Sequence, residues 1–213
     1  MSGAIEIEFF YDCSSPWTYF AFTRMVPLAK ELKLPVRWRP FLVGGVFNTV
    51  NKQVYTSRQE MFTNPENKRK MTYYLKDLGD WAELCGVTAQ WPPGHPISSV
   101  KAMRGAFYAE EQGLLIPYSK AVFEAYWGGV NPDITSDAVL LEICQQAGLD
   151  AEAFFNAIAD PVYKDLLRQN TDEVIARGGF GSPTIFINRD DMYFGNDRLP
   201  LVEHRLRQLL AEQ

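Results

Sequence analysis

The chain has 213 residues, enough for one large domain or two small ones, and a chain of this size buries roughly 70% of its unfolded surface. Hydrophobic residues make up 46% of the sequence and charged residues 22%, which excludes intrinsic disorder as the main state. Lysine and arginine number 21 against 26 acidic residues, so the formal net charge is −5, and the longest run of like charges is Lys68-Arg69-Lys70. This balance excludes the basic footprint of a nucleic-acid-binding protein.

Cysteine usage favours a reducing compartment. Cys13, Cys85 and Cys144 lie far apart and form no Cys-x-x-Cys pair.

The N-terminus has no basic segment followed by an apolar one, and no apolar run reaches the ~18 residues of a membrane span. His95 and His204 lack a cysteine or acidic partner at metal-ligand spacing. We therefore expect a cytoplasmic protein with no membrane partner, no nucleic-acid partner and no metal.

The first 41 residues follow the pattern strand, helix, strand. Apolar and other residues alternate over 5–11, apolar residues recur at helical spacing over 16–33, and a second β-rich run covers 36–41. A right-handed crossover makes the two strands of such a unit parallel.

The rest of the chain divides into a helical middle and a short β-rich end. Helical patterns cover 58–85, 98–112, 116–127, 136–147, 151–158 and 161–177, and the breaks between them hold proline or glycine. Two short β-rich runs, 184–188 and 192–194, flank a polar turn and predict a hairpin, after which apolar residues over 199–210 predict a closing helix.

These three blocks assemble most economically as one mixed four-stranded sheet that is interrupted by a helical insertion. This arrangement is an α/β, thioredoxin-like fold. We expect a discontinuous thioredoxin-like domain over 1–44 and 178–213, and an all-helical insertion domain over 45–177.

The first candidate site is Ser14-Ser15-Pro16-Trp17-Thr18, where the first strand meets the first helix. In thioredoxin-like oxidoreductases this corner holds a Cys-x-x-Cys pair. Here Ser15 and Thr18 stand at that spacing, so dithiol exchange through the corner is excluded. The Ser15 hydroxyl and the nearby helix N–H groups are suited to bind a thiolate, yet Ser-Pro is also a common helix cap, and both interpretations stay open. We expect Cys13, at the strand end, to be a buried and inert thiol.

Two further candidates lie near the C-terminus. A cis proline at Pro183 would turn the backbone of Ser182 toward a peptide-like ligand, whereas a trans proline there would be an ordinary strand start. Asn196 and Asp197 precede the closing helix, where they suit the charged end of an amino acid or act as simple caps.

Five segments together resemble the 2-hydroxychromene-2-carboxylate isomerase family, whose close relatives are the kappa-class glutathione transferases. The likeness runs from residue 5 to about residue 205. It is carried by Phe10-Tyr11-Asp12-Cys13-Ser14-Ser15-Pro16-Trp17-Thr18-Tyr19, by Arg39-Pro40-Phe41-Leu42-Val43-Gly44-Gly45-Val46-Phe47, by Val100-Lys101-Ala102-Met103-Arg104, by Gly181-Ser182-Pro183-Thr184 and by Phe194-Gly195-Asn196-Asp197-Arg198. The resemblance implies a thioredoxin-like domain interrupted by a helical domain, glutathione bound between the two, and a homodimer.

The resemblance also implies a role for individual residues. Ser15 resembles the serine that holds the glutathione sulfur, Ser182 the residue before the cis proline Pro183 that pairs with the cysteinyl backbone, and Asn196 and Asp197 the γ-glutamyl contacts. Asn51 and Lys70 resemble contacts from the insertion domain to the tripeptide. For the acceptor, a small aromatic carboxylate, the candidates are Lys52 and Trp17.

The activity that the resemblance implies is the interconversion of 2-hydroxychromene-2-carboxylate and trans-o-hydroxybenzylidenepyruvate in aromatic catabolism such as naphthalene degradation. Glutathione acts there as a cofactor that adds as thiolate, permits bond rotation and is eliminated unchanged. Ile97-Ser98-Ser99 stands where many of these isomerases carry an asparagine, so the acceptor is less constrained than the glutathione site. The alternatives are a kappa-like transferase or peroxidase, and a non-catalytic thiol or peptide binder.

Overall fold

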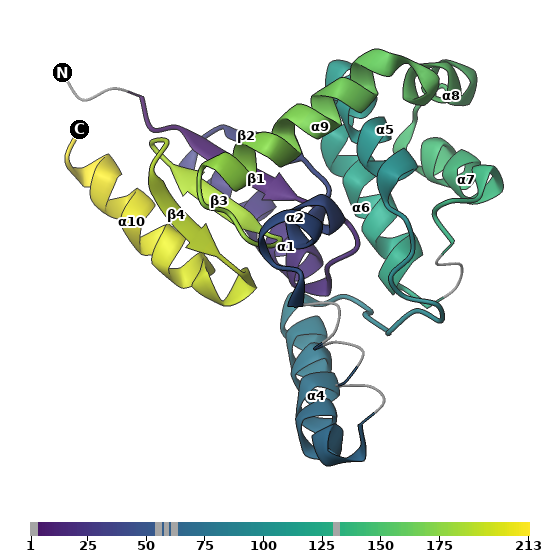
Figure 1. Cartoon of the computed structure of the whole chain (residues 1–213). Helices are drawn as coiled ribbons and strands as arrows, with labels where there is room; N and C mark the ends of the chain where they lie inside the picture. The colour runs from purple at the N-terminus through teal and green to yellow at the C-terminus, as the bar shows by residue number, and fades with distance from the viewer. Residues whose placement is uncertain (1–3, 54–56, 58–59, 61–63, 130–132) are drawn as a thin grey trace.

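A mixed sheet of four strands forms the centre of the computed structural model, which describes residues 4–53, 57, 60, 64–129 and 133–213 (Figure 1). The strands lie in the order β2-β1-β3-β4. β1 pairs with β2 in parallel and with β3 antiparallel, and β3 pairs antiparallel with β4. Their bounds are β1 (Ile7–Tyr11), β2 (Val36–Pro40), β3 (Thr184–Ile187) and β4 (Asp191–Phe194). The expected thioredoxin-like topology is confirmed.

Helices connect and cover these strands. α1 (Pro16–Leu32) joins the two parallel strands, and α10 (Leu199–Ala211) closes the chain after the short η2 (Asn196–Arg198). Between β2 and β3 lie α2 (Val43–Val50), η1 (Pro65–Asn67), α4 (Lys68–Cys85), α5 (Val100–Glu111), α6 (Leu115–Trp127), α7 (Asp137–Ala147), α8 (Ala151–Ala159) and α9 (Pro161–Ala176). The predicted helical middle is therefore confirmed, although the start of the pattern predicted from residue 58 lies partly outside the described residues. No helix in the described part of the chain is long and apolar enough to cross a membrane.

Two hydrophobic clusters cover the two faces of the sheet. Because side chains alternate along a strand, Ile7, Phe9 and Tyr11 face a cluster that includes residues of α1 and α10, whereas Phe10 faces the opposite one. This opposite cluster holds Val43, Val46 and Phe47 of α2, Val174 of α9, and Phe10, Phe41 and Phe186. Figure 1 shows α2 and α9 lying across this side of the sheet.

The helices α5 to α8 pack against the end of β1 through the same core as α1. The Tyr11 hydroxyl is 2.8 Å from Ser119 Oγ on α6, and Trp127 Nε1, also on α6, donates to the Cys13 carbonyl at 2.9 Å. These buried bonds fix the helical part against the strand end where the candidate site begins. The domain boundaries at 45 and 177 stay a prediction.

α2 is an element that the sequence pattern did not predict. Its segment contains Gly44 and Gly45, and glycine in a helix costs about 1 kcal/mol relative to alanine. Packing favours the helix because a Cβ at Gly45 would lie 2.9 Å from Thr171 Cγ2 on α9. Helix α2 therefore forms through its contacts with α9 and the sheet and not through local propensity.

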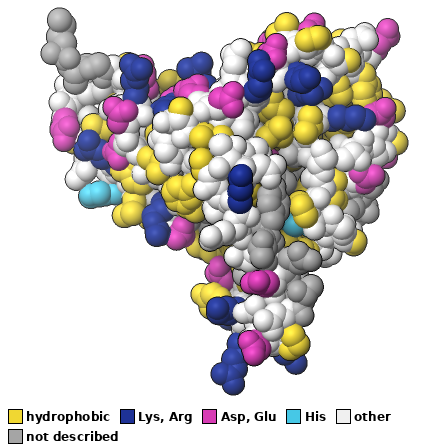
Figure 2. All heavy atoms as spheres, viewed as in Figure 1, with side chains coloured by type: hydrophobic (Ala, Val, Ile, Leu, Met, Phe, Trp, Pro, Cys, Tyr) yellow, Lys and Arg dark blue, Asp and Glu magenta, His cyan; other side chains and the backbone are white. Residues whose placement is uncertain are grey.

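α4 projects from the body of the molecule (Figure 1). Its second half packs against α1, where Leu78 and Ala82 are buried beside Phe20. Its first turn, with exposed Lys68, Arg69 and Lys70, is far from this contact, and Figure 2 shows Lys and Arg side chains at the lower tip of the projection.

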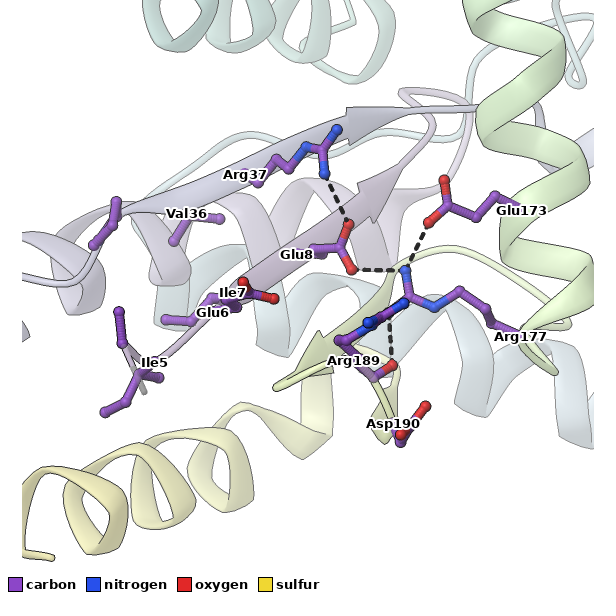
Figure 3. Close-up of a pocket in the computed structure, with 12 residues that line it drawn as sticks. Ile5, Glu6, Ile7, Glu8, Val36, Arg37, Glu173, Arg177, Arg189 and Asp190 are labelled. Atoms are coloured by element: carbon purple, nitrogen blue, oxygen red, sulfur yellow. Dashed lines mark hydrogen bonds and ion pairs between the residues drawn. The ribbon is translucent and has the colours of Figure 1, made fainter. Parts of the chain in front are cut away.

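An ion-pair network stabilises the end of the sheet opposite the candidate site. Arg37 and Arg177 both contact Glu8, and Arg177 also pairs with Glu173, beside a cleft of about 750 Å³ (Figure 3). Arg39, with a side chain only 8% exposed, bonds Glu8 at 2.6 Å and also pairs with Glu173. It donates to Asn170 Oδ1 from Nε at 3.0 Å and from Nη2 at 2.6 Å. Arg39 is the buried centre of this network.

Arg39→Met should lower the free energy of unfolding by about 3–5 kcal/mol, because it removes the buried guanidinium that bonds Glu8, Glu173 and Asn170 together. Arg37→Met is the matched control: Arg37 is 69% exposed and 3.7 Å from the same carboxylate, so we expect a loss below about 1 kcal/mol. Chemical denaturation of both variants at neutral pH measures the difference. Equal losses would contradict the central role of Arg39.

Candidate functional site

Ser15 lies at the corner between β1 and α1 and caps the helix. Its Oγ accepts from the Thr18 N–H at 3.3 Å, and Pro16 occupies the first helical position. The same hydroxyl donates to the Ser182 carbonyl at 3.1 Å. Ser15 therefore joins the start of α1 to the loop before β3, which an ordinary cap does not do.

Ser182 forms hydrogen bonds with three residues at the corner between β1 and α1. Besides the bond from Ser15, its Oγ accepts from the Asp12 N–H at 3.0 Å and lies 2.7 Å from Thr18 Oγ1. The Ser182–Pro183 peptide bond is cis, as the cis alternative considered for Pro183 requires. Ser15 and Thr18, at the spacing of a redox dithiol, thus both contact the backbone or side chain of Ser182.

A cavity of about 440 Å³ opens beside this corner, between α1, α4 and η2. We call it the first cavity. Its lining residues are Trp17, Tyr73, Asp77, Trp81, Ser182, Phe194, Gly195, Asn196 and Asp197. It brings together Trp17, Ser182, Asn196 and Asp197, four of the residues that the sequence singled out, and adds Asp77, which the sequence analysis missed.

The η2 end of the first cavity is shaped by Gly195 and Arg24. Gly195 has φ +98°, and a Cβ there would lie 2.7 Å from Asp197 Oδ1, so only glycine allows Asp197 its position. Arg24 Nη1 on α1 donates to the Asn196 carbonyl at 3.1 Å and to Asn196 Oδ1 at 2.9 Å. Asn196 is buried, whereas Asp197 is exposed and pairs with Arg198 at 2.5 Å.

Five of the predicted site residues lie outside the lining of this cavity: Ser15, Pro183, Asn51, Lys52 and Lys70. Lys70 is exposed in the first turn of α4, seven residues before Asp77 and therefore on the same face of the helix, about 10 Å further out. Asn51 ends α2 as its C-cap, and Lys52 follows it as an exposed residue. Both lie at the far end of α2 from the α1 corner.

A second cavity of about 360 Å³ lies on the other side of the corner, between α2 and the segment that leads into α5. Its lining residues are Asp12, Ser14, Leu42, Val43, Gly44, Gly45, Phe47, His95, Pro96, Ile97, Ser98, Ser99 and Val100. The lining carries hydroxyl, imidazole and carboxyl groups beside an apolar wall. Neither Lys52 nor Trp17 belongs to it.

Asp12 is the buried acidic group of the second cavity. Its carboxylate accepts from the Ser14 N–H and from the Val43 N–H, each at 2.9 Å, and contacts Ser99. Burial raises the pKa of Asp12, while these hydrogen bonds oppose the increase. Asp12 therefore holds the α1 corner, the start of α2 and the start of α5 together. The sequence did not indicate this role, because two of the partners of Asp12, Val43 and Ser99, come from distant segments.

The three cysteines are unpaired. Cys13 is buried, its N–H donates to Met103 Sδ at 3.4 Å, and burial raises the pKa of its thiol well above the ordinary value. The expected burial of this thiol at the strand end is confirmed, and its inertness stays a prediction. In the described part of the chain, no three metal-ligating side chains come together.

Comparison with known proteins identifies the family of the chain. The family model described as a DsbA-like thioredoxin domain matches residues 6–207. The chain belongs to the DsbA-like thioredoxin family. It is 29% identical over 207 residues to a 2-hydroxychromene-2-carboxylate isomerase of Pseudomonas putida, with 97% of this chain and 96% of that protein covered.

Two further similarities point the same way. A solved structure of a 2-hydroxychromene-2-carboxylate isomerase superposes with a TM-score of 0.79 at 28% identity, covering 97% of this chain and 96% of the other. The human glutathione S-transferase kappa 1 is 26% identical over 215 residues, with 94% of this chain and 90% of that protein covered. The resemblance found in the sequence motifs is confirmed along nearly the whole chain.

We expect no dithiol oxidase or insulin reductase activity, because Ser15 and Thr18 occupy the redox positions and the Cys13 thiol is buried. Cys13→Ala should therefore show no more of either activity than the unmodified protein. Insulin turbidity and thiol oxidation assays on both proteins test this. Dithiol turnover that persists in the Cys13→Ala variant would show that another thiol performs it.

Proposed function

We propose that the protein is a glutathione-dependent isomerase that interconverts 2-hydroxychromene-2-carboxylate and trans-o-hydroxybenzylidenepyruvate. The observation that carries the proposal is the hydrogen bond from Ser15 to Ser182, a lining residue of the cavity that also holds Asp77 and Asp197. The similarity to enzymes named 2-hydroxychromene-2-carboxylate isomerase supports the reaction class.

We assign each residue of glutathione to polar groups in or near the first cavity. Asp197 and Asp77 suit the γ-glutamyl ammonium, and the indole and phenol rings beside them add apolar walls. The Ser182 carbonyl suits the cysteinyl N–H. Lys70, further along α4, suits the carboxylate at the glycyl end. These assignments place the cysteinyl sulfur beside Ser15.

Ser15 changes its hydrogen bond when the ligand binds. Its hydroxyl donates to the Ser182 carbonyl, whose second lone pair remains for a ligand N–H. With that N–H in place, the hydroxyl rotates to donate to the ligand sulfur, close to the positive N-terminal end of α1. Each unit by which this contact lowers the thiol pKa corresponds to about 1.4 kcal/mol of preference for the thiolate.

Bound glutathione supplies a thiolate that adds to a conjugated carbon, so that the former double bond rotates before the thiolate is eliminated. The second cavity is where we place the acceptor, because it reaches the same corner through Ser14 and its volume of about 360 Å³ suits a small aromatic acid. Ser98, Ser99 and His95 offer hydrogen bonds to the oxygens of the acceptor. Lys52, the cation that the resemblance suggested for this substrate, needs a movement of α2 or of its own side chain to reach it.

Two further properties belong to this proposal. The three free cysteines suit a reducing cytoplasm, where the chain would work as part of an aromatic catabolic route such as naphthalene degradation. A homodimer is the assembly that we expect.

The test is to supply the chromene substrate with glutathione in substoichiometric amount and to follow the ultraviolet spectrum of the ring-opened product. We expect more molecules converted than glutathione present. Reduced glutathione alone should also raise the melting temperature, since binding at ~100 times the dissociation constant stabilises by about 2.7 kcal/mol. Absence of both effects in folded protein would overturn the proposal.

Consumption of one glutathione per acceptor molecule would instead identify a kappa-like transferase, a function that the similarity to glutathione S-transferase kappa 1 also supports. A raised melting temperature without any conversion would identify a thiol-binding protein. The two measurements together therefore separate the three functions.

Ser15→Ala should cost about 1 kcal/mol of stability as a lost cap and reduce turnover at neutral pH, because the bound thiol regains a higher pKa. Activity should recover as the pH rises toward the ordinary thiol pKa of about 8.5, where solvent supplies the deprotonation. Pre-steady-state or steady-state rates from pH 6 to about 9 measure this. A Ser15→Ala variant with unchanged turnover and pH profile would reduce Ser15 to a cap.

A further inference from the structure

His95 is presented by a tightly fixed loop. The His95 N–H donates to the Pro92 carbonyl at 3.2 Å, and Gly94 has φ +77°, so Pro93 and Gly94 match the central positions of a type II turn. The Gln90 N–H, just before the turn, donates to the Trp127 carbonyl at the end of α6 at 2.8 Å. The turn and this anchor give His95 a defined position at the wall of the second cavity.

The imidazole ring is oriented by α6 and by aromatic contacts. Nδ1 is 2.8 Å from the Tyr126 hydroxyl, which also accepts from the Ile97 N–H at 3.0 Å. The ring centroid lies 4.5 Å from that of Trp91 and 5.5 Å from that of Trp127. With the Ile97 bond on one lone pair, the Tyr126 oxygen can accept from Nδ1–H on the other. The tautomer with its proton on Nδ1 has its basic lone pair on Nε2.

His95 is also the lining group best suited to exchange a proton. The other titratable lining side chain, Asp12, uses its carboxylate oxygens to hold Ser14, Val43 and Ser99 in place. The remaining polar lining groups, Ser14, Ser98 and Ser99, are hydroxyls, which stay neutral at physiological pH. Groups near His95 that can titrate include Tyr126 on α6 and Asp12 at the end of β1.

We propose that His95 is a catalytic residue that transfers a proton during opening and closing of the acceptor's hemiketal ring. The inference rests on the proposed function, because a 2-hydroxychromene is a cyclic hemiketal. His95 Nε2 accepts the proton of the C2 hydroxyl as the C2 carbonyl forms and the bond from C2 to the ring oxygen breaks. The electron pair of that bond stays on the ring oxygen as a phenolate. The imidazolium then returns its proton to the phenolate, so charge and atoms balance without an oxidant or reductant.

The decisive variant is His95→Asn, because the asparagine side-chain amide occupies the position of Nδ1 and keeps the contact with Tyr126, whereas Nε2 is lost. We expect kcat for the chromene to fall by about 10²-fold or more. The KM for glutathione should stay unchanged, since His95 lines the second cavity and not the first. His204→Asn, at an exposed position on α10, is the matched control and should change neither value.

Two readouts separate proton transfer from a purely structural role. The acidic limb of the pH-rate profile should contain protonation of both the glutathione thiolate and His95, and in His95→Asn it should become shallower because only the thiolate remains. Glutathione addition to an open-chain conjugated ketone, which has no ring to open, should be affected much less than conversion of the chromene.

A measurement without turnover completes the test. Chromone-2-carboxylate, a stable planar analogue, should quench tryptophan fluorescence through Trp91 and Trp127 and should shift the His95 ring signals in nuclear magnetic resonance spectra. Binding that leaves the His95 signals unmoved, or a His95→Asn variant with full kcat and an unchanged acidic limb, would overturn the inference. Loss of glutathione binding in the unmodified protein would instead overturn the proposed function.

If His95→Asn fails to fold, His95→Gln provides the second test, since glutamine keeps a polar group near the Nε2 position but cannot titrate. A folded His95→Gln protein with an unchanged acidic limb and full turnover of the chromene would also overturn the inference. Circular dichroism and the melting temperature establish that either variant is folded before its kinetics are measured.

Discussion

The hydrogen bonds of Ser182 hold the functional end of the molecule together. Its carbonyl accepts from Ser15, and its hydroxyl contacts Thr18 and the Asp12 N–H, so the loop before β3 is fixed to the start of α1. Residues about 165 positions apart in the sequence thereby form one surface. Arg24, also on α1, bonds Asn196 of η2, so the loop before β3 and η2 are both held against the same helix. The first cavity lies between these contacts, and in the proposed function a tripeptide reaches both ends of it at once.

Asp12 extends this arrangement to the second cavity at an energetic cost. A buried carboxylate without a cationic partner is destabilising, and burial accordingly raises its pKa. Hydrogen bonds from Ser14, Val43 and Ser99 offset part of that cost and at the same time fix the starts of α2 and α5. At the opposite end of the sheet, Glu8 and Glu173 lie among arginines and contribute stability instead. Ion pairs therefore stabilise the end of the sheet that holds Glu8 and Glu173. The buried carboxylate without a cationic partner, Asp12, lies at the other end, beside the candidate site.

Sequence patterns correctly predicted the elements that form through interactions between residues close together in the chain. Alternation over 5–11 and helical spacing over 16–33 identified the first strand and helix, and the position of Ser15 and Pro16 identified the cap. Helix α2 was missed because its glycines disfavour a helix and only contacts with α9 and the sheet compensate. Asp77 and Arg24 were missed for a related reason. Nothing near them in the sequence indicates that α4 and α1 bring them to η2. Five of the residues taken from the resemblance line neither cavity: Ser15, Pro183, Asn51, Lys52 and Lys70. The roles that the resemblance implies for all the site residues stay predictions.

The replacement of a redox pair by Ser15 and Thr18 explains why this site needs a thiol from outside. A corner that stabilises negative charge at a helix N-terminus acidifies a cysteine where one is present. A serine hydroxyl stays protonated at neutral pH, so the same corner keeps its preference for an anion but has no nucleophile of its own. The nearest thiol, Cys13, is buried against Met103 on the opposite side of the turn and cannot substitute. In the proposed function the nucleophile therefore arrives with the ligand, which binds Asp197 and Asp77 while its sulfur remains at Ser15.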